Sequence, residues 1–139
     1  MRRRIEVRAT ARLPPAVDSH AQTVLVVDDD PSIRLLCRLN LELEGWSVRE
    51  AGGLPQAREQ LADGAVDVVV LDVHVGSGNG LEFLQELRRV RPGVKVAMLT
   101  GSDRLEGVDS DAVIPKPFRI EQLTTTVARL APRAARTAG

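Results

Sequence analysis

The chain has 139 residues, of which 43% are hydrophobic and 27% charged, and its formal net charge at pH 7 is zero. This length and composition suit one soluble domain with a single core, and the balanced charge gives no reason to expect nucleic-acid or membrane binding. No apolar run approaches the roughly 20 residues that span a bilayer. Because Cys37 is the one cysteine, the chain cannot form an internal disulfide. Chains without disulfides are typical of a reducing cytoplasm. We therefore expect a cytoplasmic protein.

Residues 1–22 contain five arginines and a Pro-Pro pair without a helical or strand period. Because chain termini of this kind are usually poorly ordered, we predict a flexible arm there. A docking or nucleic-acid-binding arm is the alternative, although no aromatic residues are interleaved with the arginines. From residue 23 to residue 131, apolar runs alternate with helical patterns, which predicts one α/β domain. Residues 132–139 are expected to form a flexible tail.

The strands and helices of this domain are predicted as follows, in chain order. We expect strands at Thr23–Asp28, Ser47–Ala51, Val66–Asp72, Val94–Leu99 and Ala112–Pro115. We expect helices at Pro31–Glu44, Leu54–Ala62, Leu81–Val90 and Ile120–Leu130, with a glycine-rich loop at 76–80. Residues 102–111 have room for only one or two turns of a further helix. Strands separated by helices predict a parallel sheet with right-handed crossovers.

The first helix has the clearest boundary signals. Asp30 is expected to cap its amino end, with Pro31 at the first helical position and Gly45 beyond its carboxyl end. Its core face is predicted from the residues that follow a helical period, namely Ile33, Leu36, Cys37, Leu41 and Leu43.

Polar residues follow four of the five predicted strands at the point where each strand ends. They are Asp28 and Asp29, then Asp72, then Thr100, and finally Lys116. The carboxyl ends of parallel strands form one edge of a sheet, so these side chains are expected to meet there. Two carboxylates 4 Å apart repel by roughly 4 kcal/mol at an effective dielectric constant of 20, so the cluster needs a cation. Oxygen ligands of this kind suit Mg²⁺ or Mn²⁺.

The same residues suit phosphoryl transfer. One carboxylate can act as a nucleophile and become an aspartyl phosphate. The transfer needs mainly positioning and neutralisation of the phosphoryl oxygens. Lys116 can neutralise one oxygen, and the Thr100 hydroxyl can hydrogen-bond another.

Together, these motifs make the chain resemble the receiver domains of two-component response regulators. The resemblance rests on Val24–Asp30, Val68–Asp72, Gly80–Glu82, Leu99–Gly101 and Pro115–Phe118. It implies a flavodoxin-like α/β fold, a (βα)5 sandwich with strand order 2-1-3-4-5, here with a shortened fourth helix. It also implies that Asp72 accepts a phosphoryl group from a phosphohistidine of a histidine kinase or phosphotransfer protein. Thr100 would be the switch hydroxyl and Lys116 the phosphate-binding lysine.

The resemblance further implies a metal set and a backbone feature. Asp28, Asp29 and Asp72 would bind Mg²⁺, with Mn²⁺ as an alternative, and the backbone carbonyl of His74 would be a further ligand. The peptide bond between Lys116 and Pro117 would be cis, a form that is common only before proline.

Two features depart from the family pattern. Only fifteen residues separate Thr100 from Lys116, which is too few for a full fourth helix, and Val113 stands where the family often has an aromatic residue. Both changes fall on the face that the family commonly uses for dimerisation and output. We therefore expect partners to contact the first helix or the region of the fifth strand. Gly76 replaces a usual proline and is expected to loosen its loop.

Charged and aromatic residues outside the site have plainer interpretations. Arg88, Arg89 and Arg91 could form a docking patch, although such charges usually face solvent. Trp46 is expected to pack at the opposite end of the sheet from the site, and Phe83 and Phe118 are expected to pack in the core.

Three functions remain open on the sequence alone. The favoured one is a stand-alone receiver without an attached output domain, a monomer or weak dimer that signals to an unknown output protein. It would be no enzyme apart from accepting and losing its own phosphoryl group. The second is a phosphatase resembling the haloacid dehalogenases, with Asp28 as nucleophile and Asp30 as acid/base, although a later acidic motif and a cap are missing. The third is a pseudo-receiver that only binds a partner.

Overall fold

The computed structural model describes residues 22–101 and 108–131. Five parallel strands form one sheet in the order β2-β1-β3-β6-β7, which confirms the predicted flavodoxin-like order. The strands are β1 Thr23–Val27, β2 Ser47–Ala51, β3 Val68–Asp72, β6 Lys95–Thr100 and β7 Ala112–Pro115. The predicted arm and tail lie outside the described residues, except for residue 22, which precedes β1.

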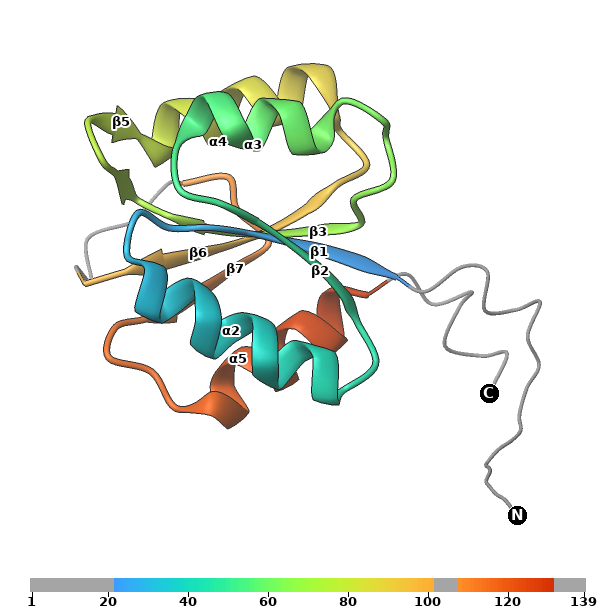
Figure 1. Ribbon diagram of the computed structural model, residues 1–139. Coiled ribbons are helices and arrows are strands. Elements are labelled where there is room, and N and C mark those ends of the chain that lie inside the picture. Colours follow the sequence, from blue (N-terminus) through green and yellow to red (C-terminus); the bar gives the residue numbers. More distant parts are fainter. Residues whose placement is uncertain (1–21, 102–107, 132–139) are drawn as a thin grey trace, which may run out of the picture.

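Helices cover both faces of this sheet. They are α2 Pro31–Leu43, α3 Leu54–Leu61, α4 Gly80–Val90 and α5 Ile120–Leu130. In Figure 1, α2 and α5 lie on one face, and α3 and α4 lie on the other. Among the described residues, every helix is too short or too polar to cross a bilayer.

The central strand β3 divides the core into two layers. Val68 to Leu71 have no exposed surface, as expected for a strand buried on both faces. Because successive side chains point to opposite faces, Val69 and Leu71 join one apolar cluster and Val68 and Val70 join the other. Phe83 is buried in the first cluster, and Phe118 and Trp46 pack against the second, so all three aromatics pack as predicted.

Two boundaries around β3 differ from prediction. The strand begins at Val68 rather than Val66. Just before it, the Asp67 carboxylate accepts the Thr23 N–H (2.9 Å) and the Asp67 N–H donates to the Thr23 carbonyl (2.9 Å), so Asp67 is tied to the start of β1. The predicted loop after β3 contains a short antiparallel hairpin of β4 His74–Val75 and β5 Gly78–Asn79. Gly76 makes its turn with φ +61°, a conformation that favours glycine.

Helix α2 begins as predicted but exposes part of its predicted core face. The Asp30 side chain accepts the Ser32 N–H (2.8 Å), and Pro31 is the first helical residue. Cys37 and Leu41 are buried, whereas Leu36 and Leu43 are 41% and 82% exposed. At 100° per residue, Leu36 and Leu43 lie on the side of the helix away from Cys37 and Leu41. The assignment of these two leucines to the core was therefore wrong.

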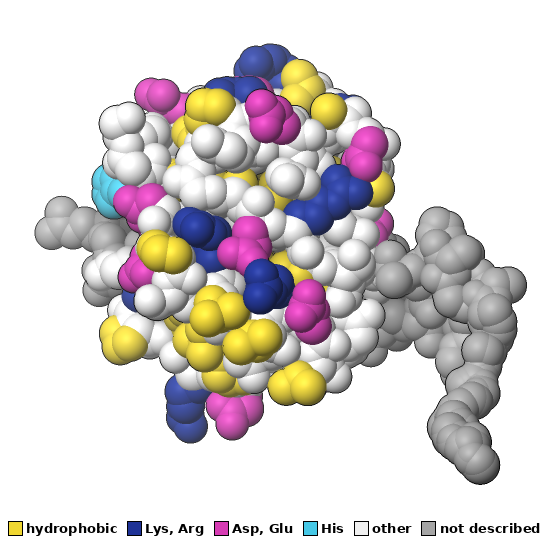
Figure 2. Space-filling model, viewed as in Figure 1, with side chains coloured by type: hydrophobic (Ala, Val, Ile, Leu, Met, Phe, Trp, Pro, Cys, Tyr) yellow, Lys and Arg dark blue, Asp and Glu magenta, His cyan; other side chains and the backbone are white. Residues whose placement is uncertain are grey.

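The exposed residues form a continuous apolar surface, which we call the leucine face. It consists of Leu35, Leu36, Leu39 and Leu43, each of them more than two-fifths exposed. Figure 2 shows hydrophobic side chains gathered at the lower front of the molecule, over α2. A helix with apolar stripes on opposite sides cannot bury both against one sheet.

Arg88 fixes the chain at the start of β7. Its guanidinium donates to the Asp109 carbonyl (2.9 and 2.7 Å), to the Val94 carbonyl (3.2 Å) and to the Asp111 carboxylate (2.9 Å). Asp111 also accepts the Val96 N–H (2.8 Å). Arg88 is therefore engaged within the chain, with its guanidinium used in contacts to the start of β7 and to the end of the loop that follows α4.

The predicted short fourth helix falls mostly outside the described residues, at 102–107. Residues 108–110 are described and are not helical.

Candidate metal and phosphoryl site

The predicted site residues come together at the carboxyl edge of the sheet. Asp28 follows β1, Asp72 ends β3, Thr100 ends β6 and Lys116 follows β7, and these four strands are neighbours. Carboxylate oxygens of Asp28, Asp29 and Asp72 lie within 4.8 Å of one another. Asp28 and Asp72 are buried, whereas Asp29 is exposed.

Lys116 connects the two buried carboxylates. Its Nζ atom lies 3.0 Å from Asp28 Oδ2 and 3.2 Å from Asp72 Oδ2. Its backbone N–H donates to the Thr100 carbonyl (2.7 Å), so the end of β6 lies directly beside the lysine. The Lys116–Pro117 peptide bond is cis, as the resemblance implied.

The pKa values of Asp28 and Lys116 are both raised. Burial raises the pKa of Asp28, and the nearby Asp72 charge adds to the rise, against the hydrogen bonds from the Asp30 N–H and Lys116. Burial alone would lower the pKa of Lys116, but the hydrogen bonds and charges of the two carboxylates outweigh it and raise that pKa. The lysine is therefore a cation at neutral pH.

One lysine does not balance this cluster. At an effective dielectric constant of 20, Lys116 attracts Asp28 by about 5.5 kcal/mol at 3.0 Å and Asp72 by about 5.2 kcal/mol at 3.2 Å. The carboxylates of Asp28 and Asp72 repel each other by about 3.5 kcal/mol or more at 4.8 Å or less. Three ionised carboxylates against one ammonium leave a net charge of about −2. The donor set therefore fits a divalent cation, and the exposed Asp29 leaves space for the waters that Mg²⁺ retains.

Thr100 and His74 complete the predicted set. Thr100 is 3% exposed and pairs with Pro115 across the sheet, which places it between the end of β3 and Lys116. His74 lies two residues beyond Asp72, in β4, and is exposed. The role of its carbonyl as a metal ligand stays a prediction.

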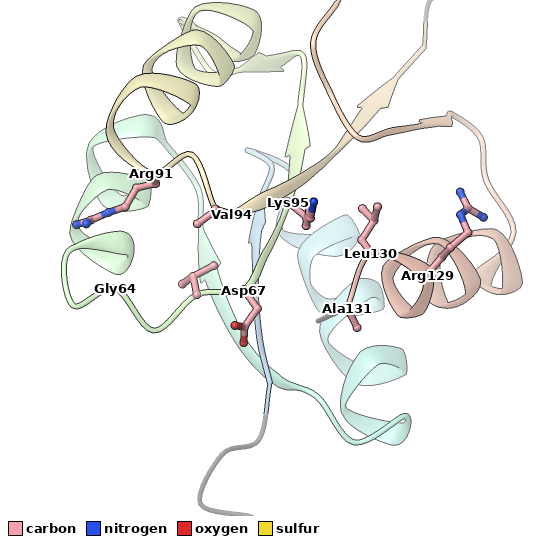
Figure 3. Close-up of a pocket in the computed structure, with 10 residues that line it drawn as sticks. Gly64, Asp67, Arg91, Val94, Lys95, Arg129, Leu130 and Ala131 are labelled. Atoms are coloured by element: carbon pink, nitrogen blue, oxygen red, sulfur yellow. The ribbon is translucent and has the colours of Figure 1, made fainter. Parts of the chain in front are cut away.

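A separate cavity of about 620 Å³ lies at the opposite end of the sheet from the acidic cluster. Its walls include Arg91, Lys95 and Arg129 beside Asp67 and Val94. In Figure 3 the Arg91 and Arg129 side chains point away from one another, so the cations do not converge on one ligand position. The Arg91 guanidinium also donates to the Ala62 carbonyl (3.3 Å).

Comparison with known families decides the identity of this fold and site. The profile of the response regulator receiver domain matches residues 24–128, which is most of the chain. The chain belongs to this family. Membership supports the receiver interpretation over a phosphatase of the haloacid-dehalogenase type.

Relatives of this receiver domain are response regulators. It is 37% identical over 112 residues to the "Probable transcriptional regulatory protein TcrX" of Mycobacterium tuberculosis, covering 76% of the chain and 48% of that protein. It is 37% identical over 106 residues to the "Response regulator MprA" of Mycobacterium sp. (strain KMS), covering 72% of the chain and 46% of that protein. The chain thus spans about half the length of these curated relatives.

Solved receiver structures share the fold over nearly their whole length. A CheY-like receiver domain protein from Methanospirillum hungatei JF-1 matches with a TM-score of 0.74 and 26% identity, over 86% of this chain and 99% of that one. The response regulator TrrA from Thermotoga maritima, solved in complex with Mg²⁺-BeF, matches with a TM-score of 0.72 and 29% identity, over 78% and 98%.

Gly80 supports the receiver site in a way that the sequence motif did not reveal. A Cβ atom at this position would collide with the Asp72 carbonyl oxygen and with the Val73 backbone. The Gly80 N–H donates to the Val73 carbonyl (2.6 Å). Glycine therefore lets α4 begin directly against the end of β3, where Asp72 lies.

Arg34 is a second supporting residue that the sequence analysis missed. Its Nη1 atom donates to the Asp28 carbonyl (2.7 Å), and its Nε atom donates to Glu50 (3.2 Å). Its position one turn after the Asp30 cap was a signal that could have placed it near the acidic turn. Glu50 comes from β2, however, so the pair depends on the tertiary structure.

Proposed function

We propose that this receiver domain accepts a phosphoryl group on Asp72 from a phosphohistidine of a histidine kinase or phosphotransfer protein. The observation that carries the proposal is the carboxylate cluster held by Lys116, in which Nζ contacts both Asp28 and Asp72. Membership of the receiver family also supports the proposal. So does the position of the motif residues at the ends of adjacent strands.

The transfer is a displacement at phosphorus. A carboxylate oxygen of Asp72 attacks the phosphorus atom, and the new O–P bond forms as the N–P bond of the phosphohistidine breaks. The imidazole nitrogen keeps the electron pair of the broken bond. The Lys116 ammonium group can stabilise the negative charge that develops on one phosphoryl oxygen, and the Thr100 hydroxyl can donate a hydrogen bond to another.

We propose Mg²⁺ as the cation of this site, with Mn²⁺ able to replace it. Asp28, Asp29 and Asp72 would hold the ion together with water and the His74 carbonyl. When bound, the ion neutralises phosphoryl oxygens during transfer. The net negative charge of the cluster and the exposed position of Asp29 support this assignment.

We also propose the leucine face as the surface on which the phosphohistidine donor docks. Helix α2 starts at the acidic turn, since its cap Asp30 lies two residues from Asp28. A donor that brings its imidazole to Asp72 must therefore approach the first turns of α2. Apolar side chains exposed next to a reactive site are typical of an interaction surface.

The phosphoacceptor is tested by incubating the chain with Mg²⁺ and acetyl phosphate and measuring intact mass. We expect a gain of one phosphoryl group that Asp72→Asn abolishes. Asp63→Asn is the control, because Asp63 is an exposed carboxylate paired with Arg49, away from the site. Uptake that survives in Asp72→Asn and disappears in Asp28→Asn would instead support the phosphatase mechanism.

The docking surface is tested with a histidine kinase that phosphorylates the unaltered chain. Leu39→Lys should slow transfer from the kinase and leave labelling by acetyl phosphate unchanged, because only the kinase needs the leucine face. Val90→Lys, on α4, is the matched control at an exposed apolar residue. Equal transfer rates for both variants would exclude the leucine face as the docking site.

The remaining expectations concern the whole protein. We propose a cytoplasmic signalling role, as a monomer or weak dimer, without enzymatic activity beyond the domain's own phosphoryl chemistry. The curated relatives extend well beyond the matched region.

A further inference from the structure

Arg34 connects the acidic turn to the edge strand β2. Its guanidinium donates through Nη1 to the carbonyl oxygen of Asp28 at 2.7 Å and through Nε to Glu50 Oε1 at 3.2 Å. Its side chain is only 21% exposed. A Cβ atom on Gly52 would lie 2.9 Å from Arg34 Nη1, so the guanidinium packs directly against this glycine.

The carbonyl that Arg34 holds belongs to the peptide unit between Asp28 and Asp29. Because a peptide unit is planar, fixing its oxygen also fixes the direction in which the chain enters Asp29. The other contacts of this turn hold Asp28 itself. Its N–H donates to the Ala51 carbonyl (3.1 Å), and its carboxylate accepts the Asp30 N–H (3.0 Å).

We propose that Arg34 is a positioning residue for the metal site of this receiver domain. By holding the Asp28 carbonyl, it orients the Asp29 carboxylate and thereby sets the affinity for Mg²⁺. The inference rests on the proposed function, because it concerns the same metal site. Loss of a group that orients a metal ligand typically costs about 10–100-fold in metal affinity.

The sign of the expected effect separates positioning from simple electrostatics. Removing a positive charge from the neighbourhood of a cation site would, by charge alone, strengthen Mg²⁺ binding. Weaker binding after loss of Arg34 therefore points to lost orientation of the ligand rather than to a changed potential.

Arg38 provides a matched control on the same helix. Its Nη1 atom contacts Glu50 Oε2 at 2.5 Å, so it also ties α2 to β2 through the same glutamate. Its ion pairs are with Glu50 and Glu42, and the Asp28 carbonyl is held by Arg34. A role limited to joining α2 and β2 would make Arg34 and Arg38 equivalent.

The test is isothermal titration of Mg²⁺ into the full unphosphorylated chain. We expect Arg34→Met to weaken binding about 10–100-fold and Arg38→Met to leave it nearly unchanged. Gly52→Ala keeps every charge but displaces the Arg34 guanidinium, and it should also weaken binding. If Arg34→Met fails to fold, the Mg²⁺ affinity of Gly52→Ala tests the positioning role in its place. Circular dichroism without Mg²⁺ checks the fold of each variant.

The possible outcomes distinguish this inference from the proposed function. Equal Mg²⁺ affinities in Arg34→Met and Arg38→Met, with Gly52→Ala like the unaltered chain, would overturn the positioning role alone. If the unaltered chain bound no Mg²⁺, or if Asp29→Asn bound it equally well, the proposed metal site itself would be wrong and the inference would fall with it.

Discussion

Replacing Lys116 by methionine removes the ammonium group that contacts both buried carboxylates, Asp28 and Asp72. The variant loses attractions of about 5.5 and 5.2 kcal/mol and keeps a repulsion of about 3.5 kcal/mol between Asp28 and Asp72, all at an effective dielectric constant of 20. Breaking a buried ion pair typically costs 3–5 kcal/mol. Because the lysine side chain is 26% exposed and partly screened by water, we expect a loss of about 2–3 kcal/mol in the free energy of unfolding.

Urea unfolding followed by circular dichroism measures this loss, with and without saturating Mg²⁺. A divalent cation can take over the charge balance, so Mg²⁺ should recover a large part of the lost stability. Lys95→Met is the control, because Lys95 is the only other lysine and is exposed at the far end of β6. The reasoning would be refuted by a Lys116→Met deficit of the same size with and without Mg²⁺.

The pH dependence of this variant follows from the raised pKa of Asp28. Burial raises that pKa above the ordinary value of 3.8, so the folded state takes up the proton at a higher pH than the unfolded state. Lowering the pH toward 3.8 therefore favours the folded state at this residue and removes the repulsion from Asp72. The deficit of Lys116→Met should shrink as the pH falls through this window, and urea unfolding at a series of pH values checks it.

Three further predictions concern the surroundings of the site. Gly80→Ala should lower the free energy of unfolding by about 3 kcal/mol, because the added Cβ meets the backbone that carries Asp72. Thermal unfolding measures this loss, and Gly93→Ala is the control because its Cβ would meet no atom. Arg88→Ala should cost about 2 kcal/mol by losing its charged hydrogen bonds; faster hydrogen exchange at 108–111 should accompany the loss, and unchanged exchange would contradict this. Burial, with the nearby Asp28 charge, raises the pKa of the Cys37 thiol to about 12; a thiol reagent at neutral pH should label it only in denaturant, and rapid labelling of the folded chain would be inconsistent with its burial.

The position of the acidic cluster was predictable from local patterns, whereas the strand order was implied by the resemblance to receiver domains. Four of the five predicted strands end at a polar residue, and parallel strands bring those ends to one edge, so the positions of Asp72 and Lys116 followed from the sequence. The leucines of α2 were harder, because a helical period identifies apolar stripes but not which stripe faces the sheet. Leu43 fits such a period and is nevertheless 82% exposed.

Contacts between distant residues were not predictable in the same way. Arg34 meets Glu50 across 16 residues, and Arg88 meets Asp111 across 23, and neither pair has a fixed spacing that marks it. The β4–β5 hairpin was missed because each of its strands has only two residues, which is too short for an alternating pattern to show.

The site residues and the leucine face lie on different elements of the fold, and this separation has an evolutionary consequence. The two buried carboxylates are attached to the ends of β1 and β3, whose side chains are buried, whereas the leucine face belongs to the solvent side of a helix. Substitutions on that side of α2 can alter which protein is recognised without disturbing the atoms that receive the phosphoryl group. A duplicated copy of such a domain could therefore acquire a new partner in a few steps while its chemistry stayed the same.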